Sequence, residues 1–99
     1  MGEIKTVAMI GLGSIGSFFA PRLEEALGHG NFRIIASGSR KERLKREGTT
    51  VNGVNYKFQI VSPDEKDPAD LVLVSVKHHA LPQAIEDIAG QVGENTAIV

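Results

Sequence analysis

Residues 7–16 read VAMIGLGSIG, an apolar run followed at once by glycines at positions 11, 13 and 16. The apolar run extends back to residue 4 and is typical of a strand that is buried on most sides. A helical pattern begins where the glycines end. The spacing Gly11-x-Gly13-x-x-Gly16 also occurs by chance, but between a strand and a helix it indicates a turn that binds a dinucleotide.

Each of the three glycines has its own task in this prediction. Gly11 permits the tight turn out of the strand, Gly13 lets a pyrophosphate approach the backbone, and Gly16 lets the helix pack closely on the sheet. The N-terminus of the helix adds free N–H groups and a partial positive charge. The alternative is a turn whose glycines serve packing only. The predicted cofactor-binding turn consists of Gly11, Leu12, Gly13, Ser14, Ile15 and Gly16.

The helix pattern covers residues 15–27 and contains a proline at position 21. Residues 28–30, Gly-His-Gly, end it. Because Pro21 removes one backbone hydrogen bond, we expect a kink or a break near residues 17–21. We predict that Phe18 and Phe19 belong to the core rather than to a platform on which a ligand stacks.

Strand and helix patterns alternate along the rest of the chain. The Asn52-Gly53 pair indicates a β-hairpin whose second strand covers residues 54–61. The whole order predicts an α/β fold: a Rossmann-like parallel sheet flanked by helices, with a small β-hairpin insertion, in one dinucleotide-binding domain over residues 1–99. Further strands are predicted at residues 32–36, 71–76 and 96–99, and helices at 40–47 and 81–89, the last with Leu81, Ile85 and Ile88 on one face.

The composition excludes several classes of protein. The chain has 99 residues, a formal charge of −1 and no cysteine. It therefore has no disulfide framework, no thiolate nucleophile and no cysteine-based metal site. Its balanced charge argues against general binding of nucleic acid or membrane surfaces. The apolar runs are too short for a membrane span and no signal peptide is visible, so we expect a cytoplasmic protein.

The end of the second strand indicates which cofactor binds. An acid there would hold a ribose hydroxyl, as in NAD-dependent proteins. This chain instead has Ser37-Gly38-Ser39-Arg40-Lys41, and its first acid is Glu42. Hydroxyls, a glycine and cations favour a 2′-phosphate and therefore NADP(H), with Ser37, Ser39 and Arg40 as contacts. Lys45 and Arg46 are interpreted as part of a solvated helix face with intrahelical ion pairs.

Lys77 follows the most apolar strand directly and is expected at the same edge of the sheet as the glycine turn. A cation there meets a phosphate or a carboxylate, or it is simply a surface lysine. His78 and His79 are interpreted as exposed loop residues rather than catalytic ones, and no third ligand suits a metal site. Asp70, before the strand, is predicted to be a cap or turn residue.

The whole chain resembles the N-terminal domain of ketopantoate reductases (2-dehydropantoate 2-reductases). The stretch at residues 69–77, ADLVLVSVK, is the most discriminating part of the match at its distance from the glycines. The other matching stretches are IGLGSIGSFF at residues 10–19, VNG at 51–53 and VSPDE at 61–65.

The resemblance implies an oxidoreductase that reduces ketopantoate to pantoate with NADPH, on the route to pantothenate and coenzyme A. In that family the glycine loop binds the pyrophosphate, and the lysine that Lys77 matches binds an adenosine-side phosphate. Ser37 stands where family members often carry an arginine. The catalytic residues belong to a helical C-terminal domain that the 99 residues do not contain, so we expect no catalytic residue here. We expect the chain alone to bind nucleotide weakly, with a 2-oxo acid substrate bound only by the full-length enzyme.

Three other functions stay open: a non-catalytic nucleotide-sensing module, a reductase of another 2-oxo acid, and an S-adenosylmethionine-dependent methyltransferase. The missing acid after the second strand counts against the methyltransferase. We also expect an exposed apolar patch near the last strand, and self-association through it into a homo-oligomer.

Overall fold

A five-stranded sheet forms the centre of the computed structural model, which describes residues 4–11 and 14–99. All pairings within this sheet are parallel, and the order is β5-β2-β1-β6-β7. If the two hairpin strands are left out and the remaining five are renumbered along the chain, the order is 3-2-1-4-5. This order confirms the Rossmann-like prediction. The strands are β1 (Val7–Ile10), β2 (Phe32–Ile35), β5 (Gln59–Val61), β6 (Leu71–Val74) and β7 (Ala97–Ile98).

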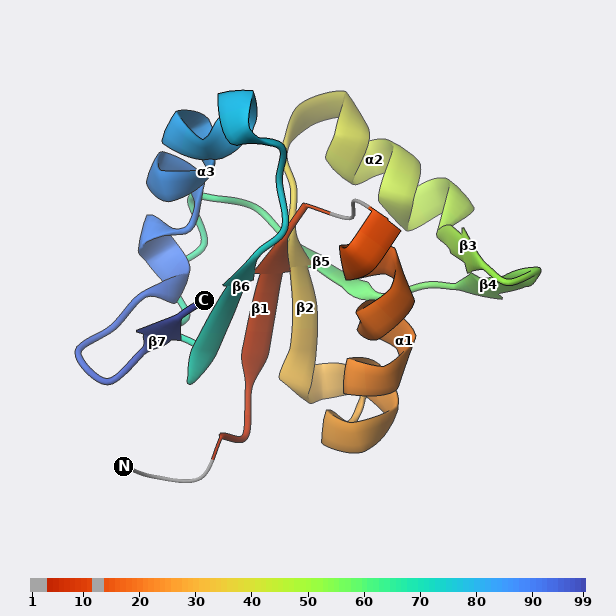
Figure 1. Cartoon of the computed structure of the whole chain (residues 1–99), viewed down its shortest axis with the longest axis horizontal. Helices are drawn as coiled ribbons and strands as arrows, with labels where there is room; N and C mark the ends of the chain where they lie inside the picture. Colours follow the sequence, from red (N-terminus) through yellow and green to blue (C-terminus); the bar gives the residue numbers. More distant parts are fainter. Residues whose placement is uncertain (1–3, 12–13) are drawn as a thin grey trace.

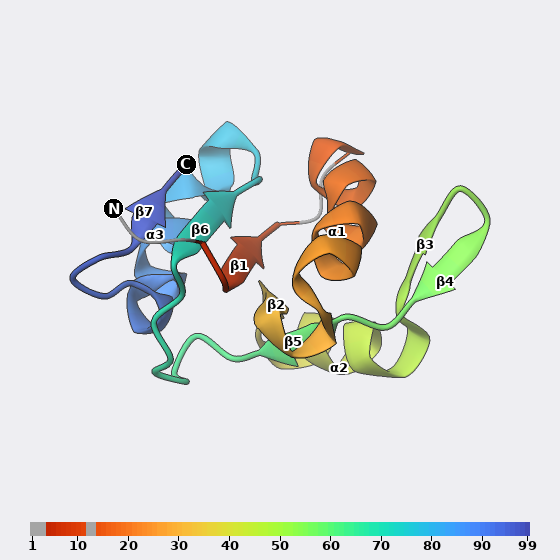
Figure 2. The ribbon, with the colours of Figure 1, turned by 90° about the horizontal axis from the view of Figure 1, so that it is seen from below.

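Helices cover both faces of this sheet (Figure 1), and Figure 2 shows α1 and α3 on opposite sides of it. Successive strand residues point to opposite faces, so each face has its own core. Val7 and Met9 belong to the core under α1 (Ser14–Leu27) and α2 (Gly38–Glu47). Ala8 and Ile10 belong to the core under α3 (Leu81–Asp87).

The helix α1 continues through Pro21, so the predicted break is wrong. Proline lacks one N–H donor, and packing on the sheet offsets that single loss. The predicted core positions of Phe18 and Phe19 are also wrong, because both rings are about half exposed, at 48% and 47%. The face of α1 that packs on the core is formed by Ala20, Leu23 and Leu27.

The hairpin is shorter than predicted. It consists of β3 (Thr49–Val51) and β4 (Val54–Tyr56), joined by Asn52 and Gly53, both with positive φ. Residues 59–61 do not extend its second strand, because they pair with β2 in the main sheet instead. Phe58 explains the switch: its ring is buried edge-on against Phe32, with the centroids 5.6 Å apart.

The apolar face of α3 also differs from the prediction. Ala84 and Ile88 are buried, whereas Leu81 and Ile85 are exposed. The helix follows a 3₁₀ turn, His78–Ala80, and ends at Asp87. Near β7, Ile98 and Val99 are exposed. The expected apolar patch and self-association through it stay predictions. Among the described residues, no helix has the length and apolar character needed to cross a membrane.

A buried arginine joins β2 to two distant segments. Arg33 is only 4% exposed, and its Nε donates to Oε1 of Gln91 over 2.6 Å. Its Nη2 donates to the carbonyl oxygen of Asp67 over 2.7 Å, and its Nη1 lies 3.4 Å from the Asp67 carboxylate. This side chain therefore holds the loop before β6 and the turn after α3 against the sheet.

Candidate functional site

The carboxyl ends of β2, β1 and β6 lie side by side at one edge of the sheet, the upper edge in Figure 1. From β1 the chain turns to α1 on one face, and from β6 it runs towards α3 on the other. Such a reversal of direction opens a crevice at the edge, where ligands of open parallel sheets bind.

Gly11 stands at this point and cannot carry a side chain. Its φ is 86°, and an added Cβ would lie 2.2 Å from the carbonyl oxygen of Ser75. The two strand ends are held this close by the N–H of Ser75, which donates to the carbonyl oxygen of Ile10 over 2.8 Å. The sequence predicts the turn at Gly11 but not this contact, because no local pattern links it to Ser75. Its role in cofactor binding stays a prediction.

The remaining residues of the predicted turn are placed only in part. Leu12 and Gly13 lie outside the described residues. Ser14, Ile15 and Gly16 form the first turn of α1, where backbone N–H groups have no partner within the helix. The N-terminus of a helix of this length attracts anions. The backbone of residues 14–16 therefore suits the pyrophosphate that the sequence predicts there.

After β2, residues 37–40 are all exposed; Ser37 precedes α2, and residues 38–40 form its first turn. Ser39 and Arg40 line a surface hollow of about 350 Å³ together with Arg43 and Arg46. Lys41 points elsewhere: its Nζ bonds to Oγ of Ser62 and lies 3.9 Å from the Glu65 carboxylate. Of the two cations predicted for a phosphate, only Arg40 is therefore available.

The intrahelical ion pairs predicted for Lys45 and Arg46 do not form among the described residues. Sequence reasoning also missed Arg43, which stands in a run of charges that is typical of any solvated helix.

Lys77 is exposed and lies three residues beyond the end of β6, at the same edge as Gly11. Its carbonyl oxygen accepts the N–H of Ala80 and so begins the 3₁₀ turn that leads into α3. The side chain of His79 is exposed. Within the described part of the chain, no group of three His, Cys, Asp or Glu side chains could hold a metal ion.

Asp70 lies at the amino end of β6, away from this site, and its carboxylate joins the segment before β1 to the start of β6. Its predicted role as a cap or turn residue stays a prediction. Its carboxylate accepts the N–H groups of Lys5 and Thr6 over 2.8 and 3.0 Å, and its own N–H donates to Oγ1 of Thr6. The backbone hydrogen bonds from Lys5 and Thr6 hold the pKa of Asp70 below its ordinary value of 3.8.

A pH dependence of stability follows from this lowered pKa. The pKa of Asp70 is lower in the folded state than in the unfolded state. Its contribution to folding stability is therefore complete above the unfolded-state pKa and is lost as pH falls through the folded-state pKa. We expect Asp70→Asn to be destabilised near neutral pH, with the difference from the native chain shrinking below about pH 4. Urea denaturation at several pH values measures it. Asp64→Asn, which removes an exposed carboxylate, is the control; a difference independent of pH would contradict the assignment.

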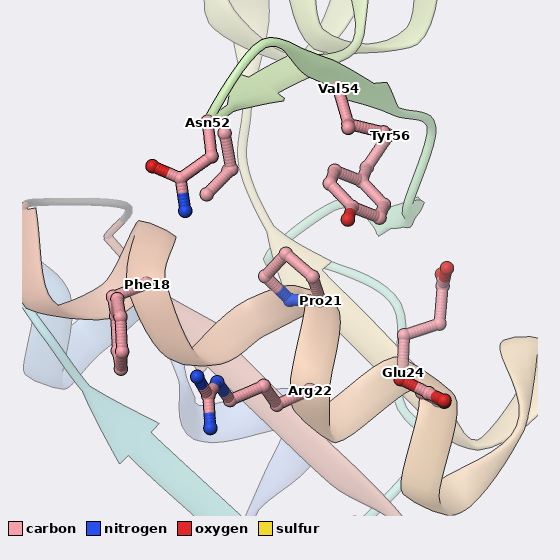
Figure 3. Close-up of a pocket in the computed structure, with 9 residues that line it drawn as sticks. Phe18, Pro21, Arg22, Glu24, Asn52, Val54 and Tyr56 are labelled. Carbon is pink, nitrogen blue, oxygen red and sulfur yellow. The ribbon is translucent and has the colours of Figure 1, made fainter.

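A second hollow, of about 560 Å³, lies between α1 and the hairpin (Figure 3). Asn52 and Tyr56 reach from the hairpin towards α1, and Pro21 lies below them. The Arg22 guanidinium carbon is 4.7 Å from the centroid of the Phe18 ring. The sequence did not predict this hollow, because it depends on how the hairpin lies over the helix. Its lining is Phe18, Pro21, Arg22, Glu24, Glu25, Val51, Asn52, Val54 and Tyr56.

The sheet order and the glycine at the end of the first strand define a Rossmann-like domain of the type that binds nucleotides. A family model described as "Ketopantoate reductase PanE/ApbA" matches residues 7–99, and the chain belongs to this family.

Two curated relatives and one solved structure show the range of similar proteins. A 2-dehydropantoate 2-reductase of Mesorhizobium japonicum is 26% identical over 94% of this chain and 30% of its own length. The uncharacterized oxidoreductase YkpB of Bacillus subtilis is 26% identical over 92% of this chain and 31% of its own length. A D-mandelate dehydrogenase solved with NADH and anilino(oxo)acetate is 25% identical, with a TM-score of 0.76, over 94% of this chain and 32% of its own. The chain thus spans about 30% of the length of these curated relatives.

Proposed function

We propose that this chain is the NADPH-binding domain of a cytoplasmic oxidoreductase that reduces 2-dehydropantoate to pantoate, a step towards pantothenate and coenzyme A. The observation that carries the proposal is the match of residues 7–99 to the ketopantoate reductase family. The similar 2-dehydropantoate 2-reductase of Mesorhizobium japonicum supports the choice of substrate. When bound, the cofactor supplies a hydride to the 2-oxo carbon of the substrate.

The donor groups at the edge of the sheet fit such a cofactor. The N–H groups of residues 14–16, which have no partner within the helix, suit the pyrophosphate, and no carboxylate lines the hollow beside Ser39 and Arg40. Hydroxyl and guanidinium groups donate hydrogen bonds to a 2′-phosphate, which a carboxylate would repel. The residues proposed to hold the cofactor are Gly11, Leu12, Gly13, Ser14, Ile15, Gly16, Ser37, Ser39, Arg40 and Lys77.

On this proposal, residues outside this chain complete the enzyme. Reduction of a ketone needs an acid for the developing alkoxide and a clamp for the substrate carboxylate, in addition to the hydride donor. The described residues include those of the proposed cofactor site, but no convergent acid and clamp lie at its edge. The 99-residue chain alone is therefore proposed to bind nucleotide and to turn over little or no substrate.

A second candidate is an NADH-dependent reductase of another 2-oxo acid. Two observations favour it. Ser37 leaves the end of β2 without the arginine that family members often carry. The similar D-mandelate dehydrogenase was solved with NADH. The two candidates share a fold and differ in the phosphate site and the substrate.

Calorimetric titration of the chain with NADPH and NADH separates them. We expect NADPH to bind more tightly, and Arg40→Ala or Lys77→Ala to weaken it about 10-fold while changing NADH little, because each loses a charge-assisted hydrogen bond to phosphate. Lys57→Ala removes an exposed cation that precedes β5, at the opposite edge, and is the control. Equal binding of both cofactors would favour the second candidate, and binding of neither would contradict the cofactor site.

A further inference from the structure

The exposed side of α2 carries three arginines in a stripe. Arg40, Arg43 and Arg46 are spaced by three residues, so each step advances about 4.5 Å along the helix. All three are exposed and, with Ser39, they form the lining of one hollow of about 350 Å³. The opposite side of α2 is occupied differently: Leu44 packs on the core and Lys41 bonds to Ser62.

These guanidinium groups have no ionic partner within the part of the chain that the structure describes. Glu42 and Glu47 stand on the same helix but form no ion pair with them, and no carboxylate lines the hollow. Like charges three residues apart on a helix repel each other. The hollow therefore presents only hydrogen-bond donors with excess positive charge, together with one hydroxyl group that can also accept, and this set matches a phosphate dianion.

The hollow begins where the adenosine end of a dinucleotide lies in this fold. Ser39 and Arg40 are in the first turn of α2, directly after β2, and Arg43 is one turn further. The ribose of a bound dinucleotide is recognised at the end of the second strand. Ser37, at that end, has a short side chain and leaves room for an anion held from α2.

We propose that Arg43, together with Ser39 and Arg40, binds a phosphate monoester on the adenosine ribose and so determines the preference for a phosphorylated cofactor. This inference rests on the proposed function and places the discrimination on the outward side of α2 rather than at Ser37. Arg46 lies at the far end of the stripe and adds positive charge. The planar guanidinium of Arg43 supplies paired donors that a lysine cannot reproduce.

The test uses fragments that need neither a substrate nor catalysis. The chain is titrated with adenosine 2′,5′-bisphosphate, with adenosine 5′-monophosphate and with inorganic phosphate. We expect the bisphosphate to bind at least about 10-fold more tightly than the monophosphate, and Arg43→Gln to remove most of that preference. Arg43→Lys keeps the charge and should retain part of the preference for the bisphosphate. The monophosphate should bind all variants alike.

The control is Lys45→Gln, which removes one charge from the same helix but not from the lining of the hollow. An unchanged preference in Arg43→Gln would overturn the inference. So would an equal loss in Lys45→Gln, which would indicate diffuse charge, or inorganic phosphate binding as tightly as the bisphosphate, which would indicate a site for free anions. Circular dichroism confirms that each variant is folded.

Titration with NADH distinguishes failure of the proposed Arg43 phosphate site from failure of the proposed cofactor-binding function. If NADH binds and Arg43→Gln leaves the bisphosphate preference intact, the inference fails and the proposed function stands. If neither NADH nor NADPH binds to the folded chain, the proposed function fails, and the inference that rests on it fails too.

Discussion

Alanine in place of Gly11 is expected to destabilise the domain by about 3 kcal/mol, which is a large part of the stability of a small domain. Two costs add. The backbone at Gly11 has a φ of 86°, which an L side chain rarely adopts. The new methyl group would also lie 2.2 Å from the carbonyl oxygen of Ser75 and 2.7 Å from Cγ1 of Val76, so the two strand ends must separate.

Urea denaturation measures this loss, and two other glycines separate its causes. Gly53 has a φ of 81° but open space around it, so Gly53→Ala should show only the backbone cost of about 1–2 kcal/mol. Gly30 has neither a positive φ nor a close neighbour, so Gly30→Ala should be nearly neutral. A loss in Gly11→Ala no larger than in Gly53→Ala would show that the contact with Ser75 is not tight.

Replacement of Arg33 by methionine is expected to cost about 3 kcal/mol, because it removes the donors while keeping much of the volume. The side-chain oxygen of Gln91, a residue 1% exposed, would lose the partner that lies 2.6 Å away. The carbonyl oxygen of Asp67 would lose its donor as well. The Asp67 carboxylate is exposed and stays solvated, so the cost comes mainly from the two uncharged acceptors.

The shift in urea midpoint of Arg33→Met tests this, with Arg46→Met on the exposed side of α2 as the matched control. Gln91→Leu alone should also destabilise, whereas the double variant should lose less than the sum of the two, because each single change leaves an orphaned partner. A loss below about 1 kcal/mol in Arg33→Met, or strictly additive losses, would show that the contact contributes little.

Local patterns in the sequence were enough to predict the frame of the fold but not every partner within it. The apolar run of β1, the glycines after it and the alternation that follows predict the parallel sheet with crossover helices. Residues 54–61 read as one strand because periodicity cannot tell which neighbour a strand joins. In the structure, the burial of Phe58 against Phe32 and the pairing of β5 with β2 separate β5 from β4.

The face of a helix that packs on the core was harder to predict. In α1 several apolar positions compete, and the small Ala20 is buried while Phe18 and Phe19 are exposed. In α3 the small Ala84 is buried in place of Ile85 for the same reason: close packing on a sheet favours a short side chain. The size of an apolar side chain therefore does not predict its burial where the helix packs closely on the sheet.

Parts of the candidate site follow from the sequence, and parts need the structure. The sequence predicts four of the site residues from their position after a predicted strand: Gly11, Ser39, Arg40 and Lys77. The sequence does not show that Lys41 is absent from the phosphate site. Its side chain is held by Ser62, which lies far along the chain. Arg43 was missed because charge alone does not say which residues share a hollow.

We propose that a nicotinamide dinucleotide binds at the carboxyl edge of the sheet. Its most direct test is NMR of the ¹⁵N-labelled chain during addition of NADPH, read at each backbone amide. We expect chemical-shift changes at Gly11, at residues 14–16 and at residues 37–40, with the hairpin residues 51–56 unchanged. Shifts confined to the hollow between α1 and the hairpin, or no shifts at saturating NADPH, would contradict it.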